Sequence, residues 1–350
     1  MTASVFDDPW LCGLFGDGEI AAIWSHERRR SHMLAFEAAW ARALGACGLA
    51  DAGTAERAAA AILAAHVDDG DIRAGTAVDG VPVLALVRAL KAVAGETAVH
   101  TGSTSQDVID TALALTLKET SALIAARIST LSDALAGLES RFGGNRLMGR
   151  TRMQVATEIT AADRIAAWRE PLADHAERLA ALRPRVERVQ VGGAAGDRKA
   201  LGDKAQAVTD HVALSLGLHP TARSWQARRD GIAEYAGFLS LVSGTLGKIG
   251  QDIALMAQQG IGEIALSGGG GSSAMPHKQN PVLAELLVTL ARFNAVQVSG
   301  MHQAMVHEQE RSGAAWSLEW MILPQMAAAT ARSLSAGLAV TAGVERMGTV

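Results

Sequence analysis

A glycine-rich segment with two serines and a lysine carries the residue types best suited to chemistry. Residues 267–282 read SGGGGSSAMPHKQNPV. Four consecutive glycines give the backbone free access to positive φ, which predicts a mobile loop. Asn280 as N-cap and Pro281 as first helical residue predict a helix start, where N–H groups and the dipole favour an anion. A plain glycine linker explains the spacing equally well, and a P-loop does not match because no Gly directly precedes Lys278.

Residues 271–280 resemble the signature of the fumarase/aspartase superfamily, Gly-Ser-Ser-x-Met-Pro-x-Lys-x-Asn, and contain every fixed position. Residues 100–112 (HTGSTSQDVIDTA) resemble the first substrate-binding block of the superfamily, and residues 148–156 (MGRTRMQVA) resemble the second. With residues 225–230 and 307–312, the resemblance covers most of the chain. Within the superfamily, the glycine-rich segment and the run HEQERSGAAW are most similar to the carboxymuconate cycloisomerases in their short bacterial form.

The resemblance implies addition or removal of a group across a carbon–carbon bond beside a carboxylate. The carbanion formed there carries its charge on carboxylate oxygens, so it needs preorganised donors. In the cycloisomerase reaction, an internal carboxylate of 3-carboxy-cis,cis-muconate adds to a double bond and gives 4-carboxymuconolactone, in the protocatechuate branch of aromatic breakdown. The electron sink is the substrate's own carboxylate, so the resemblance implies no organic cofactor.

The resemblance also assigns roles within the glycine-rich loop. Ser272 matches the acid/base of the superfamily, and Lys278 and Asn280 match positions that hold a substrate carboxylate. A serine hydroxyl is a poor base unless its alkoxide is stabilised, so Lys278 and nearby N–H groups are expected to shift the pKa of Ser272. Ser273 is expected among the substrate-binding residues. His277 either contacts the substrate or hydrogen-bonds within the loop, and whether it or Ser272 transfers the proton stays open.

Further substrate contacts are expected from outside the loop. Thr104, Ser105 and Gln106 match positions that bind carboxylate from the start of a helix, and their place just before a long apolar stripe supports this independently. His100 either lines the pocket or is structural. Arg229 either binds substrate or forms a surface ion pair with the aspartate that follows it.

The second block departs from the superfamily pattern at Arg152, where many members carry histidine. Arginine cannot deliver a proton at neutral pH because its pKa exceeds about 12. An amine or hydroxide leaving group needs that proton, whereas a carboxylate, with a pKa of about 4, does not. Arg152 can instead clamp a carboxylate bidentately or pair with Glu285, which matches the acidic partner of the catalytic histidine. The departure therefore favours lactone formation over amine or hydroxide elimination.

Long apolar stripes at helical spacing predict the elements that hold these blocks. One stripe predicts a helix of roughly 30 residues; its members are Ile109, Leu113, Leu117, Ile124, Ile128, Leu131 and Leu135. Residues 159–189, 230–259 and 282–307 are also helix-like, and small residues on these helices favour a close-packed bundle. Shorter helices are predicted at 27–49, 55–66 and 83–93, with loops at 143–145, 191–196 and 267–280.

We therefore predict an all-α protein with a fumarase/aspartase-like bundle. Residues 1–95 form a small N-terminal helical domain, residues 96–340 the long-helix bundle and residues 341–350 a tail. The third, C-terminal helical domain usual in the superfamily is expected to be absent or much reduced. The resemblance implies a homotetramer in which each active site draws its blocks from different subunits.

Composition narrows the function classes. Of 350 residues, 49% are hydrophobic but only 4% aromatic, which favours packed helices over a β-sandwich. A net charge of −4 argues against a nucleic-acid or anionic-membrane surface. Two cysteines, no basic-then-apolar N-terminus and no long apolar run favour a cytoplasmic protein without metal. The expected partner is a small tricarboxylate. An adenylosuccinate lyase-like enzyme and a non-catalytic helical scaffold are the alternatives.

Overall fold

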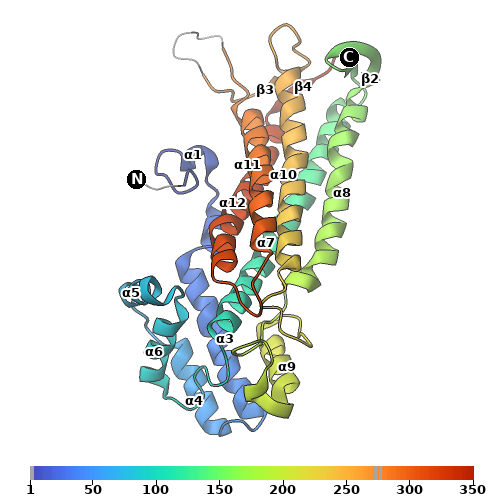
Figure 1. Ribbon diagram of the computed structural model, residues 1–350. Helices are drawn as coiled ribbons and strands as arrows, with labels where there is room; N and C mark the ends of the chain where they lie inside the picture. Colours follow the sequence, from blue (N-terminus) through green and yellow to red (C-terminus); the bar gives the residue numbers. More distant parts are fainter. Residues whose placement is uncertain (1–3, 272–274, 276–277) are drawn as a thin grey trace.

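Five long helices form a bundle that occupies most of the computed structural model (Figure 1). The structure describes residues 4–271, 275 and 278–350. The predicted all-α class and the long-helix bundle are confirmed. The bundle helices are α7 (Ser105–Phe142), α8 (Ala161–Val186), α10 (Asp230–Met256), α11 (Val282–Ala304) and α12 (Ala314–Ala342).

The apolar stripe of α7 lies in the bundle core. Leu117, Ile124, Ile128 and Leu131 are at most 2% exposed and pack with side chains from the other long helices. Small residues allow close approach, because a Cβ added at Gly250 of α10 would collide with the carbonyl oxygen of Ala284 in α11. Close packing by small residues therefore sets the α10–α11 spacing, as the sequence indicates. By length and composition α11 could cross a membrane, but it packs along α10 and α12.

A smaller helical body lies at the end of the bundle where α7 begins (Figure 1). Its core contains Phe36, Trp40, Ile62 and Leu90. The helices in the N-terminal part of the chain are α1 (Cys12–Phe15), α2 (Gly18–Ile23), α3 (His26–Ala46), α4 (Ala52–Leu63), α5 (Asp69–Asp79) and α6 (Val83–Ala94). The same core also takes in α9 (Ala205–Leu216), preceded by the 3-10 helix η1 (Lys199–Lys204). The small body thus draws on chain far beyond residue 95.

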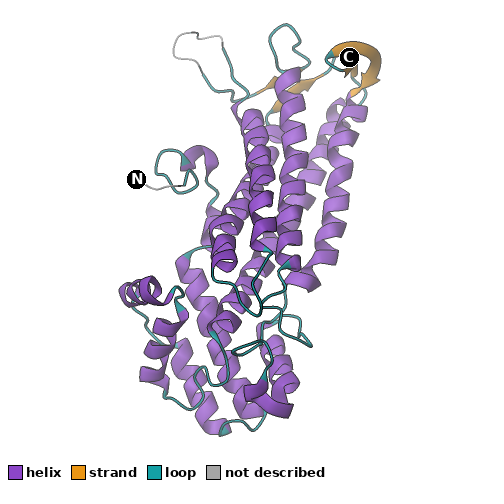
Figure 2. Cartoon of the chain, viewed as in Figure 1, coloured by secondary structure: helices purple, strands orange, loops and turns teal. Residues whose placement is uncertain are grey.

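Two small antiparallel sheets lie at the opposite end of the bundle (Figure 2). Strands β1 (Arg146–Thr151) and β2 (Gln154–Thr160) form a hairpin. Strand β3 (Ile264–Leu266) pairs with β4 (Val344–Met347), so residues predicted as a tail are in fact hydrogen-bonded sheet. The Arg146 amide donates to the Thr349 carbonyl at 2.7 Å and joins the hairpin to this sheet.

Candidate active site

The first block forms the N-terminus of α7. Thr104 is the N-cap, and its backbone N–H donates to the Asp107 carboxylate at 3.1 Å in a capping box. Ser105 is the first helical residue, and the Gln106 side chain is buried. The Gln106 amide donates to Asp110 Oδ2 at 3.0 Å and to the Gln226 carbonyl at 2.8 Å. The residues expected to bind carboxylate therefore lie at a helix start, and the hydrogen bonds of Gln106 to Asp110 and Gln226 fix its side chain there.

Asp107 anchors the neighbouring loop to this helix start. Its carboxylate accepts the backbone N–H groups of Gly192 at 2.7 Å and Gly193 at 3.0 Å, and the Gln190 amide at 3.2 Å. Burial raises the pKa of Asp107 to about 7, although these donors oppose the shift. One carboxylate thus fixes both the cap of α7 and the 191–193 loop.

Arg311 covers the first block, and the sequence analysis did not single it out. Its Nε donates to Gln106 Oε1 at 3.0 Å, and its Nη2 donates to Thr104 Oγ1 at 2.9 Å. The residue is exposed, so its guanidinium faces solvent beside the helix N-terminus. Together these groups form a cationic, hydrogen-bonding surface suited to a carboxylate. The run of residues 307–312 that extends the family resemblance was the available signal.

His100 is tied to a buried acid. Its Nδ1 lies 2.6 Å from Glu37 Oε1, and the Glu37 side chain is fully buried. The backbone of His100 has φ of 59°, a region costly for a non-glycine residue. The Trp40 indole donates to the adjacent Thr101 carbonyl at 3.0 Å, which fixes the turn. His100 therefore has a structural anchor on one ring nitrogen, beside the first block.

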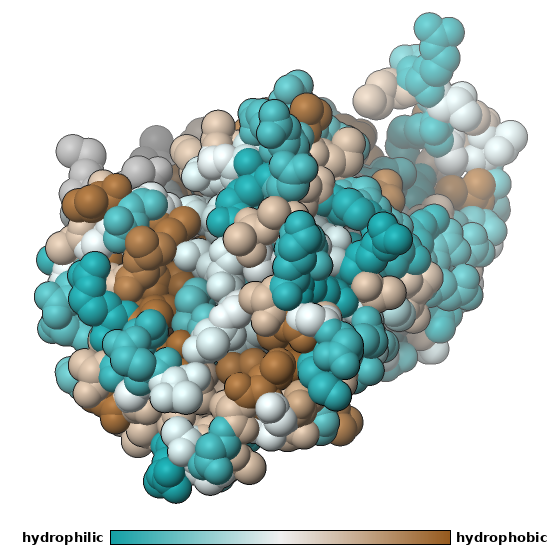
Figure 3. All heavy atoms as spheres, turned by 60° about the horizontal axis from the view of Figure 1, so that its bottom comes forward, coloured by the Kyte–Doolittle hydropathy of each residue, from teal (hydrophilic) through white to brown (hydrophobic). Residues whose placement is uncertain are grey.

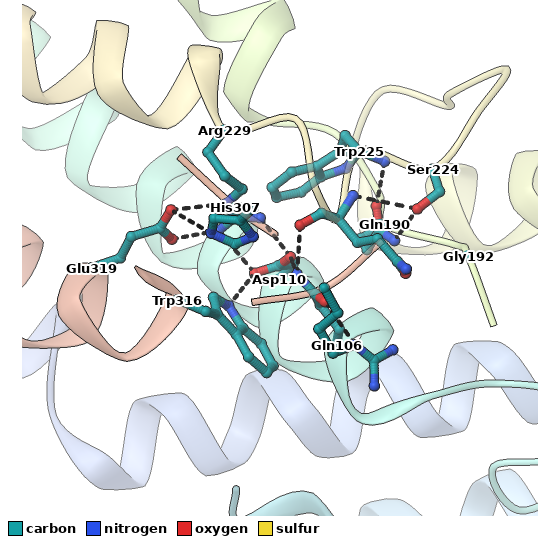
Figure 4. A network of polar contacts seen from close by, with 12 residues as sticks. Gln106, Asp110, Gln190, Gly192, Ser224, Trp225, Arg229, His307, Trp316 and Glu319 are labelled. Carbon is teal, nitrogen blue, oxygen red and sulfur yellow. Dashed lines mark hydrogen bonds and ion pairs between the residues drawn. The ribbon is translucent and has the colours of Figure 1, made fainter. Parts of the chain in front are cut away.

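Arg229 is buried in an ion-pair network (Figure 4). Its Nη1 donates to Asp110 Oδ2 at 2.7 Å, and its Nε donates to Glu319 Oε1 at 2.8 Å. Trp316 completes the cluster, because its indole donates to Asp110 Oδ1 at 3.1 Å. The predicted surface pair with Asp230 is therefore wrong, because Arg229 is buried and its guanidinium pairs with Asp110 and Glu319. Substrate binding by Arg229 stays a prediction. The residue joins α7, α10 and α12 beneath the first block.

The second block lies at the other end of the bundle. Arg152 and Met153 form the tip of the β1–β2 hairpin with φ of 48° and 66°, the geometry of a type I′ turn. Arg150 donates to Glu263 at 2.5 Å. A hollow of about 320 Å³ lies beside the hairpin; its charged lining is Arg150, Arg152, Arg164, Lys248, Asp252 and Glu263.

Cations are in excess in this hollow. Arg150 pairs with Glu263, and Lys248 pairs with Asp252. Arg152 and Arg164 have no ion pair within the described part of the protomer. The predicted pair between Arg152 and Glu285 is therefore not formed within these described residues. The hollow therefore carries two uncompensated positive charges, an arrangement that favours an anion.

The base of the glycine-rich loop is closed by backbone pairing. Gly270 N–H donates to the Asn280 carbonyl at 2.9 Å, and Asn280 N–H donates back at 2.8 Å. The structure makes Pro281, not Asn280, the N-cap of α11, a shift of one residue. Lys278 is exposed, and Glu285 is exposed in the first turn of α11. Ser272, Ser273 and His277 lie outside the described residues.

Within one protomer, the first block is remote from the other two segments. The second block and the glycine-rich loop share the end with the sheets, because the β4 segment contacts both β3 and Arg146. The first block lies at the opposite end of α7 (Figure 1). The 38 residues of α7, at 1.5 Å each, span about 57 Å. A small substrate therefore cannot contact all three segments of a single protomer.

The chain is similar to known proteins in both sequence and structure. A family model described as lyase matches residues 16–300. A 3-carboxy-cis,cis-muconate cycloisomerase of Pseudomonas aeruginosa is 38% identical over 333 residues, 93% of this chain and 72% of the relative. An N-acetyl-S-(2-succino)cysteine lyase of Enterococcus italicus is 34% identical over 98% of this chain and 76% of the relative. The crystal structure of a 3-carboxy-cis,cis-muconate lactonizing enzyme from Pseudomonas putida matches with a TM-score of 0.89 and 36% identity, over 95% of this chain and 76% of that one.

Proposed function

The chain belongs to the lyase family of the fumarase/aspartase superfamily, and on this premise we propose that it converts 3-carboxy-cis,cis-muconate to 4-carboxymuconolactone. The main support is similarity to relatives of that name along nearly the whole chain, at 38% identity in one case and 36% in another. The superfamily signature is complete from Gly271 to Asn280. We further propose a soluble, cytoplasmic enzyme.

The proposed reaction rearranges bonds within the substrate and adds one proton, which solvent supplies through Ser272. An internal carboxylate oxygen bonds to the diene, and the electron pair of that double bond moves toward the neighbouring carboxylate as an aci-carboxylate. Ser272 then delivers a proton to the α carbon and becomes an alkoxide, which solvent reprotonates. Lys278 and loop N–H groups stabilise that alkoxide. No leaving group other than a carboxylate is involved, so Arg152 does not need to donate a proton.

The proposed site offsets the three negative charges of the substrate with fixed cations and helix starts. Lys278 and Asn280 hold one carboxylate on the loop, and Arg152 in its cationic hollow binds another. Thr104, Ser105 and Gln106, with Arg311 over them, bind a carboxylate at the start of α7. Glu285 is a proposed partner across the site, and His100 a proposed pocket residue.

We propose that the site forms only in a homotetramer. The first block is about 57 Å from the other segments, so another copy must supply it. A groove of about 700 Å³ on α8, α10 and α11 is lined by Leu241, Val298 and Met305, and further hydrophobic patches break the hydrophilic surface in Figure 3. Exposed apolar groups on packed helices favour association with further copies.

Elimination of a thiol is the second candidate. The N-acetyl-S-(2-succino)cysteine lyase of Enterococcus italicus covers 98% of the chain at 34% identity. A thiolate, with a pKa of about 8.5, leaves without a strong proton donor, so Arg152 does not exclude this reaction.

The discriminating experiment follows diene absorbance of 3-carboxy-cis,cis-muconate with purified protein. Parallel reactions contain N-acetyl-S-(2-succino)cysteine and adenylosuccinate. We expect turnover of the muconate alone, and loss of nearly all turnover in Ser272→Ala with unchanged helicity. Turnover of either other substrate but not of the muconate would overturn the proposal. Full activity in Ser272→Ala would refute the role of that serine while leaving the reaction standing.

A further inference from the structure

His307 is a buried histidine that makes no side-chain hydrogen bond to any described residue. Its side chain is 0% exposed, and neither ring nitrogen has a hydrogen-bond partner among residues 4–271, 275 and 278–350. The nearest carboxylate oxygen is Oε1 of Glu319, 3.9 Å from Nε2. Figure 4 shows the ring against Arg229 and Glu319, in the network beneath the first block. An unpaired buried polar group costs about 1–3 kcal/mol, so this arrangement calls for an explanation.

The cluster around His307 has an unbalanced charge when all its acids are ionised. Asp110 and Glu319 are both buried and share the single positive charge of Arg229, which leaves one net negative charge. Burial raises the pKa of Glu319, and Arg229 offsets that shift only in part. Burial lowers the pKa of His307, and repulsion from Arg229 adds to this. One proton taken from solvent would neutralise the cluster, with Glu319 and His307 as its two adjacent holders.

The same segment of chain connects His307 to the substrate surface. Residues 305–313 join α11 to α12, and they carry both His307 and Arg311. Arg311 makes the contacts with Thr104 and Gln106, four residues after His307. Arg311 itself is exposed, so the segment is attached to the interior by the buried side chains of His307 and Ser312 and by the Glu310 carbonyl, which accepts a hydrogen bond from Gln226.

We propose that His307 and Glu319 hold one proton between them, and that the resulting hydrogen bond fixes residues 305–313 so that Arg311 faces the first block. His307 is thus a positioning residue that acts through Arg311. The inference deepens the proposed function, because Arg311 is there assigned to a substrate carboxylate.

The sign of the pH effect follows from the charges that surround the ring. Asp110 faces it from α7, Arg229 from the start of α10, Glu319 from α12 and Glu308 from its own segment. At low pH the pair holds its proton, the segment is fixed and Arg311 is in place. As the pH rises the proton is lost, the buried negative charge returns, the segment loosens and KM increases.

Hydrogen exchange tests the segment without any substrate. Exchange of peptides covering residues 305–313 is compared between about pH 6 and about pH 9, after correction for the intrinsic pH dependence. We expect about threefold faster corrected exchange at the higher pH in the wild-type protein. His307→Gln should show the fast rate at both pH values. Glu319→Gln, which mimics the protonated acid, should show the slow rate at both. Exposed His211→Gln should match wild type.

Steady-state kinetics tests the connection to the site. We expect KM for 3-carboxy-cis,cis-muconate to rise about tenfold in His307→Gln with little change in kcat, and its pH dependence to vanish. His307→Gln combined with Arg311→Ala should have the KM of Arg311→Ala alone, because His307 acts through Arg311. Additive KM effects, or wild-type exchange that is independent of pH and of His307, would overturn the inference. Absence of turnover by the wild-type protein would refute the proposed function. The hydrogen-exchange experiment would still test whether His307 fixes residues 305–313.

Discussion

Two impaired variants with defects in parts of the site that are far apart in one protomer should restore activity to each other. Ser272→Ala removes the proposed acid/base of the glycine-rich loop, whose base pairs Gly270 with Asn280 at the end with the sheets, and Arg311→Ala removes the cation over the first block. The two ends lie about 57 Å apart along α7, whereas a seven-carbon substrate spans less than about 10 Å. Each site must therefore take these two parts from different copies.

The size of the recovery follows from subunit statistics. In an equal mixture, each part of a site is intact with a probability of one half, so about one quarter of the sites are fully intact. We expect co-expressed, doubly tagged and co-purified assemblies to show about 25% of wild-type kcat/KM per site.

The assay is loss of diene absorbance, with each variant alone and a fresh mixture of the two as controls. The fresh mixture, before subunits exchange, should remain as inactive as its components. Activity of the co-assembled protein that stays at the level of the single variants would refute the reasoning, because it would mean that one copy supplies both parts.

Three further predictions concern stability. Arg229→Met leaves two buried carboxylates uncompensated and should lower the free energy of unfolding by about 3–5 kcal/mol, measured by urea denaturation. Burial, reinforced by Arg178, lowers the pKa of His175 to about 4, so His175 is neutral in the folded state above that pH. As the pH falls from about 6.5, the unfolded pKa, to about 4, the unfolded state gains a proton and the folded state should lose about 3 kcal/mol of stability. His175→Gln should flatten this limb of a pH titration of Tm. Gly250→Ala should destabilise by about 1–3 kcal/mol because its Cβ meets a backbone carbonyl, while Gly137→Ala, with open space, should stabilise slightly; equal Tm changes would contradict the packing argument.

The long helices could be predicted because their signals are local and repeated. The stripe from Leu117 to Leu135 keeps one face apolar over many turns, and the capping residue Thr104 marks where it starts. Helix α5 escaped prediction because none of its residues is buried, which leaves no apolar face to detect. The β1–β2 hairpin escaped because its turn places Arg152 and Met153 at positive φ, where asparagine or glycine is the usual signal.

The candidate site was predictable only where residues adjacent in sequence act together. The start of α7 is such a case, because Thr104, Ser105 and Gln106 are consecutive. The contacts that support them join distant residues: Arg311 lies 205 positions from Gln106, and Arg229 lies 119 positions from Asp110. No periodicity encodes such pairs, because each depends on how α7, α10 and α12 are arranged.

The participation of α9 in the small N-terminal core has a consequence for synthesis. Helix α3 is complete at Ala46, but its core partner α9 ends at Leu216, 170 residues later. At about 5–20 residues per second, the ribosome needs roughly 10–30 s to make that stretch. During this interval the apolar face of α3 that packs against α9 is exposed to solvent. The nascent chain is therefore a natural client for holding chaperones, and slower translation between the two helices should increase its aggregation.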